Sequence, residues 1–552
     1  MTDASPEAVK ESAQSESFGG HARTVMGFTL LSRISGLLRD AVCSRVFGAG
    51  AEWSAFVTAF IIPNLFRRLF GEGAISAAFI PEYARLSERD PALAHRFASL
   101  TVGALAVFLS LLVLIVELAL IVVLGLLPEG SAGRLTLVLA IVMLPFMPLV
   151  CITAMLGGML QSHGRFVPHA ASPILLNVMM AGSAAMAAWW WGLSVRDGVV
   201  VVAVSVLVAG FAQVGWCLWS LRGIAIWTRA VSDAAGLFRS MLLRMGPVII
   251  GMGTLQLGTL IDGVLAGYPV LFGATLPGGR AYPMDEGSAS VLFYASRLYQ
   301  FPLGVFGIAI ATAVFPALAR AAANALNFRL TLSRSVRLSL FIGIPATVGI
   351  MLVSKDLATA IYRGGAFSDD DVARTSATLS MYALAIWAYS LTHVLTRAFY
   401  AVGMTKVPMR VGLVTVLANV CGSIVLMWWL QERGLALATA IAACGQTLAL
   451  SVLAMRLLVR NDGAGTERVD AGAARSVMLT VGWSVLMVAC ILVVQRMTAG
   501  LLPGGAWSGS LVALARDVGL GAAIYLGGAV VMRRPELWWL LERPAKRGSG
   551  TE

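Results

Sequence analysis

Apolar stretches dominate this chain and follow one another from about residue 25 to residue 533, with short polar or charged segments between them. A helix of roughly 20 apolar residues spans the hydrocarbon core of a bilayer, so the pattern predicts an all-α polytopic membrane protein with about 14 transmembrane helices. The predicted spans are 25–47, 53–80, 97–126, 135–160, 166–192, 198–221, 243–268, 289–315, 333–353, 376–401, 408–430, 434–458, 474–495 and 512–532.

The composition excludes an ordinary soluble protein. Of the 552 residues, 58% are hydrophobic and 13% are charged, whereas soluble domains are about half apolar and about a quarter charged. The six cysteines form no CxxC or Cys/His spacing, so neither a disulfide framework nor a zinc site is predicted. The formal net charge of +12 comes mostly from Lys and Arg residues between the spans, where anionic headgroups attract them. We therefore expect membrane lipids, and no nucleic acid, as partners.

Basic residues gather in alternate connections between the spans. By the positive-inside rule these connections are cytoplasmic, which places the tails 1–24 and 536–552 and the linker 461–473 on the cytoplasmic side. The first 20 residues lack the pattern of a secretory signal, so we expect the first span to be retained. The basic residues concerned are Arg85, Arg89, Arg96, Arg222, Arg229, Arg239, Arg320, Arg329, Arg334, Arg456, Arg460, Arg468 and Arg475.

An internal repeat relates the two halves of the chain. The segment 79–85 resembles 315–320, and 164–168 resembles 403–408, at offsets of about 235 to 240 residues. Repeats of six spans each are parallel, related by an axis along the membrane normal, and such transporters bind substrate between the halves. The predicted organisation is an N-lobe at 25–230, a C-lobe at 240–460 and two additional spans at 474–535, outside the repeat.

Several arginines lie inside apolar spans, where a charge costs about 2.5 to 3.5 kcal/mol even on the lenient insertion scale. They are Arg33 and Arg39 in the first span, Arg67 and Arg68 in the second, and Arg297 in the eighth. Two interpretations stay open: the side chains snorkel or pair within the bundle, or they form an anion-binding cavity. Guanidinium groups suit phosphate because they stay charged and bind two oxygens at once.

Other residues near these arginines have predicted roles in pairing or movement. Arg68 and Glu72 are spaced i,i+4 for an ion pair, and Asp262 in the seventh span is either a paired core acid or part of a site for a coupling cation, Na⁺ or H⁺. We expect glycines beside the charges to let the first two spans bend. The predicted gating or portal residues are Gly36, Asp40, Arg68, Gly71, Glu72 and Gly73.

No enzyme motif competes with a transport function. The five histidines are scattered, and the chain has no HExxH, Walker loop or GxSxG elbow. The sequence therefore predicts a transporter without a catalytic residue, metal site or bound cofactor. Whether a cation or the membrane potential drives it stays open.

The charged spans carry motifs that resemble the MurJ (MviN) family of lipid II flippases, within the superfamily that includes MATE drug exporters. The similarity covers most of residues 25 to 535. The motifs are Ser32-Arg33 to Arg39-Asp40, Phe47-Gly48-Ala49-Gly50, Pro63-Asn64-Leu65-Phe66-Arg67-Arg68, Gly71-Glu72-Gly73-Ala74, Ala78-Phe79-Ile80-Pro81, Ser162-His163-Gly164-Arg165-Phe166, Arg297 to Val305, Arg363-Gly364-Gly365-Ala366-Phe367 and Ala398-Phe399-Tyr400-Ala401.

The resemblance implies a monomeric flippase of the bacterial cytoplasmic membrane that moves lipid II by alternating access. It implies that Arg33, Arg39, Arg67 and Arg297 line a central cavity and bind the pyrophosphate and sugar headgroup. It also places Glu72 near a lateral opening and gives the last two spans a groove for the polyprenyl tail. Because like charges in a cavity repel, we expect alanine at Arg33, Arg39 or Arg297 to abolish transport without impairing folding.

The chain departs from the family pattern at three places. Ser54 stands where many members have an acid, Ser296 stands where some members have Asp, and the connection 267–287 is long and polar.

Three rival functions also stay open, namely an exporter of other lipid-linked glycans or drugs, a membrane-embedded glycosyltransferase and a non-transporting scaffold. A cavity that binds cationic drugs would not be expected to contain four arginines, because like charges repel. A glycosyltransferase would need an external catalytic acid, and the acidic cluster 369–371 is better interpreted as a solvated helix start.

Overall fold

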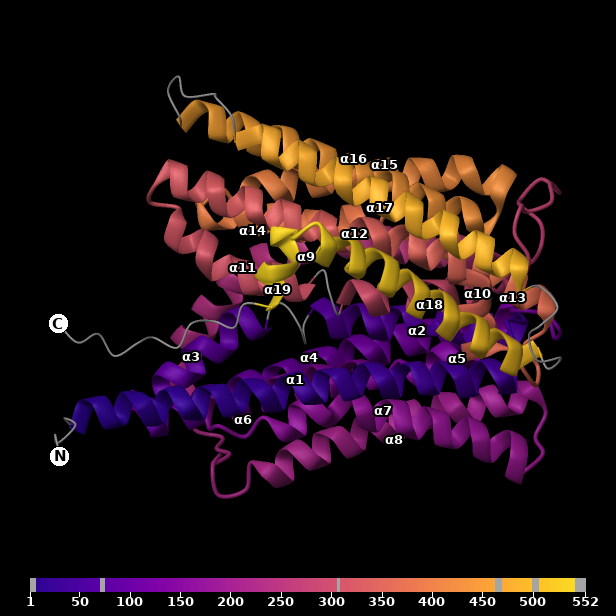
Figure 1. The fold of residues 1–552 in the computed structure, drawn as a ribbon. Helices are drawn as coiled ribbons and strands as arrows, with labels where there is room; N and C mark the ends of the chain where they lie inside the picture. Colours follow the sequence, from indigo (N-terminus) through magenta and orange to yellow (C-terminus); the bar gives the residue numbers. More distant parts are fainter. Residues whose placement is uncertain (1–5, 70–74, 305–307, 462–468, 499–505, 542–552) are drawn as a thin grey trace. The chain divides into compact units, whose positions relative to one another are not determined.

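The computed structural model describes residues 6–69, 75–304, 308–461, 469–498 and 506–541. Helices account for nearly all of these residues, and no strand occurs among them beyond two isolated bridges, Thr275 with Ala281 and Gly364 with Phe367. The predicted all-α class is therefore confirmed over the part of the chain that is described (Figure 1).

The chain divides into two compact units. The first comprises residues 1–290 together with the short segment 364–367, and the second comprises 291–363 and 368–552. The main helices of the first unit are α1 (Pro6–Phe47), α2 (Ala51–Phe66), α3 (Ile75–Arg89), α4 (Pro91–Leu126), α5 (Gly133–Met143), α6 (Phe146–Ser162), α7 (Val167–Ala185), α8 (Val195–Ser220) and α9 (Ala235–Phe272).

The second unit contains the remaining helices, apart from the first three residues of α10. They are α10 (Ser288–Pro302), α11 (Ile308–Ala321), α12 (Ala325–Tyr362), α13 (Asp369–Ala383), α14 (Ile386–Ala401), α15 (Lys406–Leu430), α16 (Glu432–Asn461), α17 (Val469–Met497), α18 (Ala506–Val531) and α19 (Pro535–Leu541).

Four of the predicted spans are each formed by two successive helices, and these interruptions follow the repeat. α2 continues into a π-helical turn at 67–69, and α10 continues into one at 303–304, about 235 residues later. The pairs α5/α6 and α13/α14 are likewise divided, at 144–145 and 384–385. Proline accounts for part of this pattern, since Pro145 and Pro302 lie at the breaks and cannot donate a backbone hydrogen bond.

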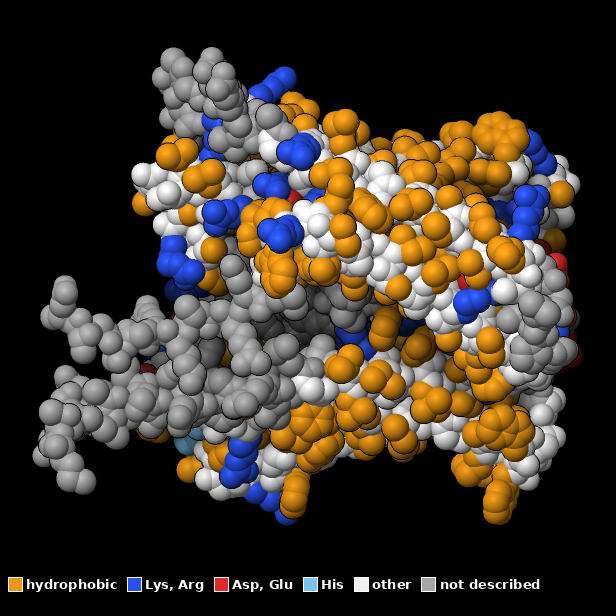
Figure 2. All heavy atoms as spheres, in the orientation of Figure 1, with side chains coloured by type: hydrophobic (Ala, Val, Ile, Leu, Met, Phe, Trp, Pro, Cys, Tyr) orange, Lys and Arg blue, Asp and Glu red, His pale blue; other side chains and the backbone are white. Residues whose placement is uncertain are grey.

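Nine helical segments among the described residues are long and apolar enough to cross a membrane: 91–126, 133–162, 167–190, 195–220, 325–362, 406–430, 432–458, 472–497 and 507–531. The protein is therefore a multi-pass membrane protein. Hydrophobic side chains also cover much of the visible surface, as lipid-facing helices require (Figure 2). The count of 14 crossings stays a prediction.

Helix α9 packs within the first compact unit, against α2, α3, α4 and α5. The predicted lobe boundary at 230–240, which follows the repeat, stays a prediction. Small residues allow this close approach: a Cβ at Gly267 would lie 2.4 Å from Oγ1 of Thr58, and one at Gly263 would lie 2.5 Å from Ile61. The compact division therefore falls after Ser290, at the start of α10.

The motif Arg363 to Phe367 supplies the segment 364–367 of the first unit. The N–H of Ala366 donates to the carbonyl of Arg45 at 2.8 Å, and Phe367 is buried. Gly365 has φ +57°, and a Cβ there would lie 2.1 Å from the Arg45 carbonyl oxygen, so this position requires glycine. Immediately afterwards Ser368 and Asp371 form a capping box at the start of α13, in agreement with the interpretation of 369–371 as a helix start.

Candidate functional site

Arg39 lies in a buried network between α1 and α7. Its Nε and Nη2 donate to Oδ1 of Asp40 at 2.9 and 2.6 Å, and its Nη1 donates to Oδ1 of Asn177 at 2.9 Å. The amide of Asn177 in turn donates to Oγ of Ser35 at 3.0 Å. Arg39 and Asp40 are only 7% and 2% exposed. Of the two interpretations, pairing within the bundle describes the geometry of Arg39, and its contact with a substrate stays a prediction.

This geometry changes what we expect of an Arg39 variant. Removal of the guanidinium would leave the Asp40 carboxylate buried without its cation, which costs stability. The expectation that Arg39 can be replaced without impairing folding therefore does not follow from its surroundings.

Arg33 lies six residues earlier on α1 in a different environment. Its side chain is half-buried, and within the described part of the chain it makes no hydrogen bond or ion pair. The intervening Gly36 faces Asn177, and a methyl group there would make an ordinary contact at 3.5 Å. The guanidinium N–H donors of Arg33 are therefore available to a ligand, whereas those of Arg39 are used by Asp40 and Asn177.

Arg67 and Arg68 occupy the π-helical turn that follows α2. Nε of Arg67 donates to Oδ1 of Asn64 at 3.2 Å, and Nη1 of Arg68 donates to Oε1 of Gln256 on α9 at 3.1 Å. Single-turn π-helical segments often mark functional sites. Gly71, Glu72 and Gly73 lie outside the described residues, and so does the predicted pair of Arg68 with Glu72.

The other two predicted site residues lie on α10 and α9. The guanidinium carbon of Arg297 lies 4.7 Å from the ring centroid of Phe293, a cation–π contact one turn away on the same helix. Because Arg297 belongs to the second unit, the gathering of all four arginines in one cavity stays a prediction. Asp262 is buried in α9, and both interpretations of its role stay open.

Ser54, the first predicted departure from the family pattern, belongs to a neutral hydroxyl pair. The Oγ atoms of Ser54 and Ser290 lie 2.8 Å apart, and the N–H of Ser290 donates to Oγ of Ser54 at 3.1 Å. Both side chains are fully buried. Ser296, the second departure, donates to the carbonyl of Phe293 at 2.8 Å. Neither position therefore brings a charge to its surroundings.

The predicted long connection 267–287 is shorter in the structure, because α9 continues to Phe272, and the remainder folds back on that helix. The ring of Tyr282 stacks on Tyr268 with centroids 4.3 Å apart, and its hydroxyl donates to the carbonyl of Leu265 at 2.8 Å. Burial, with a smaller contribution from Tyr268, raises the pKa of the Tyr282 phenol, so it stays a neutral donor.

A polar contact missed by the sequence analysis joins the middle of α3 to the C-terminal end of α6. The hydroxyl of Tyr83 and Nε2 of His163 are 3.1 Å apart. Burial lowers the pKa of His163, and the nearby His95 and Arg165 lower it further. The motif 162–166 contained this histidine, but its partner lies 80 residues away in the sequence.

A second network missed by the sequence analysis holds α19 against α12 and α17. The fully buried carboxylate of Glu536 pairs with Arg337 at 2.6 Å and Arg534 at 3.0 Å, and it accepts from Oγ of Ser476 at 2.6 Å. Burial alone would raise the pKa of Glu536, but the hydrogen bonds from Ser476, Arg534 and Arg337 hold it at about 2. The carboxylate is therefore charged throughout the physiological range.

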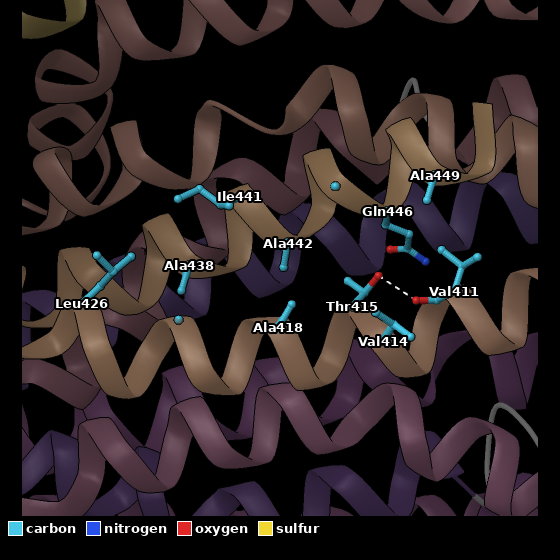
Figure 3. Close-up of a pocket in the computed structure, with 12 residues that line it drawn as sticks. Val411, Val414, Thr415, Ala418, Leu426, Ala438, Ile441, Ala442, Gln446 and Ala449 are labelled. Carbon is cyan, nitrogen blue, oxygen red and sulfur yellow. Dashed lines mark hydrogen bonds between the residues drawn. The ribbon is translucent and has the colours of Figure 1, made fainter. Parts of the chain in front are cut away.

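The cavity between α15 and α16 differs from an anion site (Figure 3). It measures about 340 Å³ and is lined mainly by small and aliphatic side chains, with Thr415 and Gln446 as its polar members. No charged residue lines it, so it cannot serve as the predicted arginine cavity.

The comparisons with known proteins agree with the charged motifs. The chain matches the model of the family described as "Lipid II flippase MurJ" over residues 43–504. The chain belongs to the MurJ family. A "Probable lipid II flippase MurJ" of Rhizobium tropici is 35% identical over 436 residues, 76% of this chain and 77% of that protein. One of Bdellovibrio bacteriovorus is 31% identical over 523 residues, 91% of this chain and 92% of that protein.

Solved structures show the same fold. "Lipid II flippase MurJ, inward closed conformation" aligns with a TM-score of 0.74 at 22% identity, covering 93% of this chain and 99% of that one. An inward-facing MATE family multidrug resistance transporter aligns with a TM-score of 0.56 at 14% identity, covering 80% of this chain and 96% of that one. The chain thus has the fold shared by MurJ and MATE proteins, and its family makes it a transporter rather than an enzyme.

Proposed function

We propose that this chain carries lipid II, the lipid-linked peptidoglycan precursor, from the inner to the outer leaflet of the bacterial cytoplasmic membrane by alternating access. Membership of the MurJ family supports the substrate. The half-buried Arg33, which has no polar partner among the described residues, is the observation that supports an anion site. A ligand with several acidic oxygens offers the partners that this guanidinium lacks.

The proposed binding site uses the arginines unequally. Arg33 binds the pyrophosphate directly, and Arg67 and Arg297 contribute further positive charge. Arg39 remains a candidate ligand contact, and its pairing with Asp40 and Asn177 also supports a positioning role, since it holds α1 against α7. Lysine should replace Arg33 only partly, because it lacks the planar fork that binds two oxygens at once.

In the proposed cycle the headgroup enters from the cytoplasm, binds the arginines and leaves on the outer side after the two lobes have rocked. The termini are cytoplasmic, the spans 474–495 and 512–532 accept the polyprenyl tail, and no covalent bond is made or broken. An inside-negative potential favours outward movement of an anion, by about 2.3 kcal/mol per charge per 100 mV. Asp262 is the candidate site if a cation such as Na⁺ or H⁺ is coupled.

Complementation of a strain depleted of its own lipid II flippase tests the proposal. The unaltered chain should restore growth, and Arg33→Ala should reach normal membrane abundance without restoring it. Arg222→Ala, which removes an exposed arginine between α8 and α9, is the matched control and should complement fully. Failure of the unaltered chain would overturn the substrate, whereas full activity of Arg33→Ala would overturn the anion site.

A further inference from the structure

α4 is the span least covered by its own protein. Its most apolar window has a mean hydropathy of 3.2, and only 11% of that window is buried, compared with 22% to 50% for the other eight candidate spans among the described residues. Exposed large side chains follow its C-terminal half, which is the outer half in the predicted topology, including Leu114 at 50%, Leu118 at 56% and Ile121 at 50%. This face is therefore open to lipid or to another protein.

A glutamate lies in the C-terminal half of this exposed span. Glu117 precedes the end of α4 at Leu126 by nine residues, which is about 14 Å at 1.5 Å per residue. Glu117 lies on the same helix face as Leu109 and Val113, at i,i+4 spacing. Neighbouring helices cover Leu109 and Val113, which are 0% and 5% exposed, and Glu117 lies one turn beyond them. The side chain is half-buried, and no described residue forms a hydrogen bond or ion pair with it.

Four other buried carboxylates among the described residues are paired with arginine. Asp40 pairs with Arg39, Glu432 with Arg374, Asp517 with Arg516, and Glu536 with both Arg337 and Arg534. An ionisable group inside the membrane is costly without such a partner. An ionised Glu117 inside the hydrocarbon would need a basic partner, and no described residue supplies one, so that partner would come from another protein.

We propose that the outer half of α4 is the docking site for a transmembrane helix of another membrane protein, recognised by a salt bridge from Glu117 to a basic side chain on that helix. Leu114, Leu118 and Ile121 supply the apolar contact beside the ion pair. A second copy of this chain does not fit, because a two-fold contact through this face would oppose two Glu117 carboxylates. After Arg96, α4 also carries no basic residue that could pair with these carboxylates.

Site-specific photo-crosslinking in native membranes tests the docking site. A benzophenone amino acid at Leu118 should give a discrete adduct with one membrane protein, while the same group at Val414, 66% exposed on α15, should not. Glu117→Gln and Glu117→Leu should reduce the Leu118 adduct at least about tenfold, as loss of a buried interfacial ion pair does. The crosslinked helix should carry Arg, Lys or His, and exchanging the two charges, with Glu117→Arg on this side, should restore the adduct.

Several outcomes would overturn the proposal. They are adducts with lipid alone, an adduct with a second copy of this chain, an adduct unaffected by Glu117→Leu, and a partner helix without a basic residue. The isolated protein provides a second readout. If Glu117 has its partner outside the chain, Glu117→Leu should leave the melting temperature in detergent unchanged or raise it. A clear decrease would reveal a partner within the chain and also refute the docking site.

Discussion

Two regions of this protein contain buried or half-buried arginines. The two regions differ in how many of these arginines have an acidic partner. Where α19 packs against α12 and α17, Arg337 and Arg534 share the buried carboxylate of Glu536. On α1, Arg39 is paired in the same manner with Asp40, but Arg33, six residues earlier, has no such partner among the described residues. A fully partnered arginine stabilises the fold, whereas one with unused donors is available to a ligand.

The largest effect is expected for Glu536→Ala, because it leaves the buried Arg534 and the half-buried Arg337 without their anion. Removal of one partner from a buried pair costs about 3 to 5 kcal/mol. We therefore expect a large decrease in the melting temperature of the purified protein in detergent. Asp369→Asn, in the exposed pair with Arg363, is the control and should leave it unchanged. Equal melting temperatures for the two variants would show that the buried pair stabilises the protein no more than the exposed one.

The Glu536 network also predicts a response to acid. The pKa of Glu536 is held at about 2, below the ordinary value of 4.5, so the folded protein favours the ionised form. Its contribution to stability is complete above pH 4.5 and is lost as the pH falls from 4.5 towards 2. The unaltered protein should lose stability in this window, and Glu536→Gln should lose less over the same range.

A somewhat smaller loss of stability is expected for Arg39→Ala. The change leaves the Asp40 carboxylate buried without its cation, at a cost of about 3 kcal/mol. The double variant Arg39→Ala/Asp40→Ala should recover part of this loss, since both charges are then gone. Thermal unfolding of the two single variants and the double variant measures the coupling, and strictly additive effects would contradict the pairing.

Arg33→Ala should change stability little, within about 0.5 kcal/mol, because it breaks no contact with a described residue. Its effect should appear in transport instead. Unfolding of Arg33→Ala and Arg39→Ala under the same conditions compares the two arginines of α1 directly. A loss for Arg33→Ala as large as that for Arg39→Ala would assign Arg33 a structural role.

The smallest effect concerns His163, where burial first, and then His95 and Arg165, lower the pKa below the ordinary 6.5. The folded protein therefore disfavours the protonated ring, and stability should decrease slightly as the pH falls below 6.5. His163→Gln should remove this part of the pH dependence. Melting temperatures at pH 7.5 and 5.5 measure it, and an unchanged difference between them would show that His163 does not contribute.

Much of the fold could be predicted because membrane insertion depends on local composition. The apolar stretches, their lengths and the all-α class follow from the cost of placing a backbone in hydrocarbon. The repeat was visible in short motifs, and the paired helix interruptions follow it. The close packing of α9 on α2 could not be predicted, because it depends on the small size of Gly263 and Gly267 opposite a helix about 200 residues earlier in the sequence.

The candidate site was predicted only in part. Arginines inside apolar spans are conspicuous in a sequence, so Arg33, Arg39, Arg67 and Arg297 could be selected from the order of residues alone. Glu117 was equally visible as an acid within an apolar run, and the sequence analysis overlooked it. Glu536 could not have been found in this way, because it lies outside the spans and its partner Arg337 is 199 residues away.

The sequence by itself determined that this chain is helical, crosses a membrane several times and belongs to the MurJ family, because hydrophobic length and short motifs are properties of contiguous residues. Only the tertiary structure decided which charges are paired. Arg33 and Arg39 share a helix and a residue type, yet only Arg39 meets Asn177, which lies 138 residues away on α7. Pairing depends on which distant helix faces pack together, and no local pattern in the sequence specifies that.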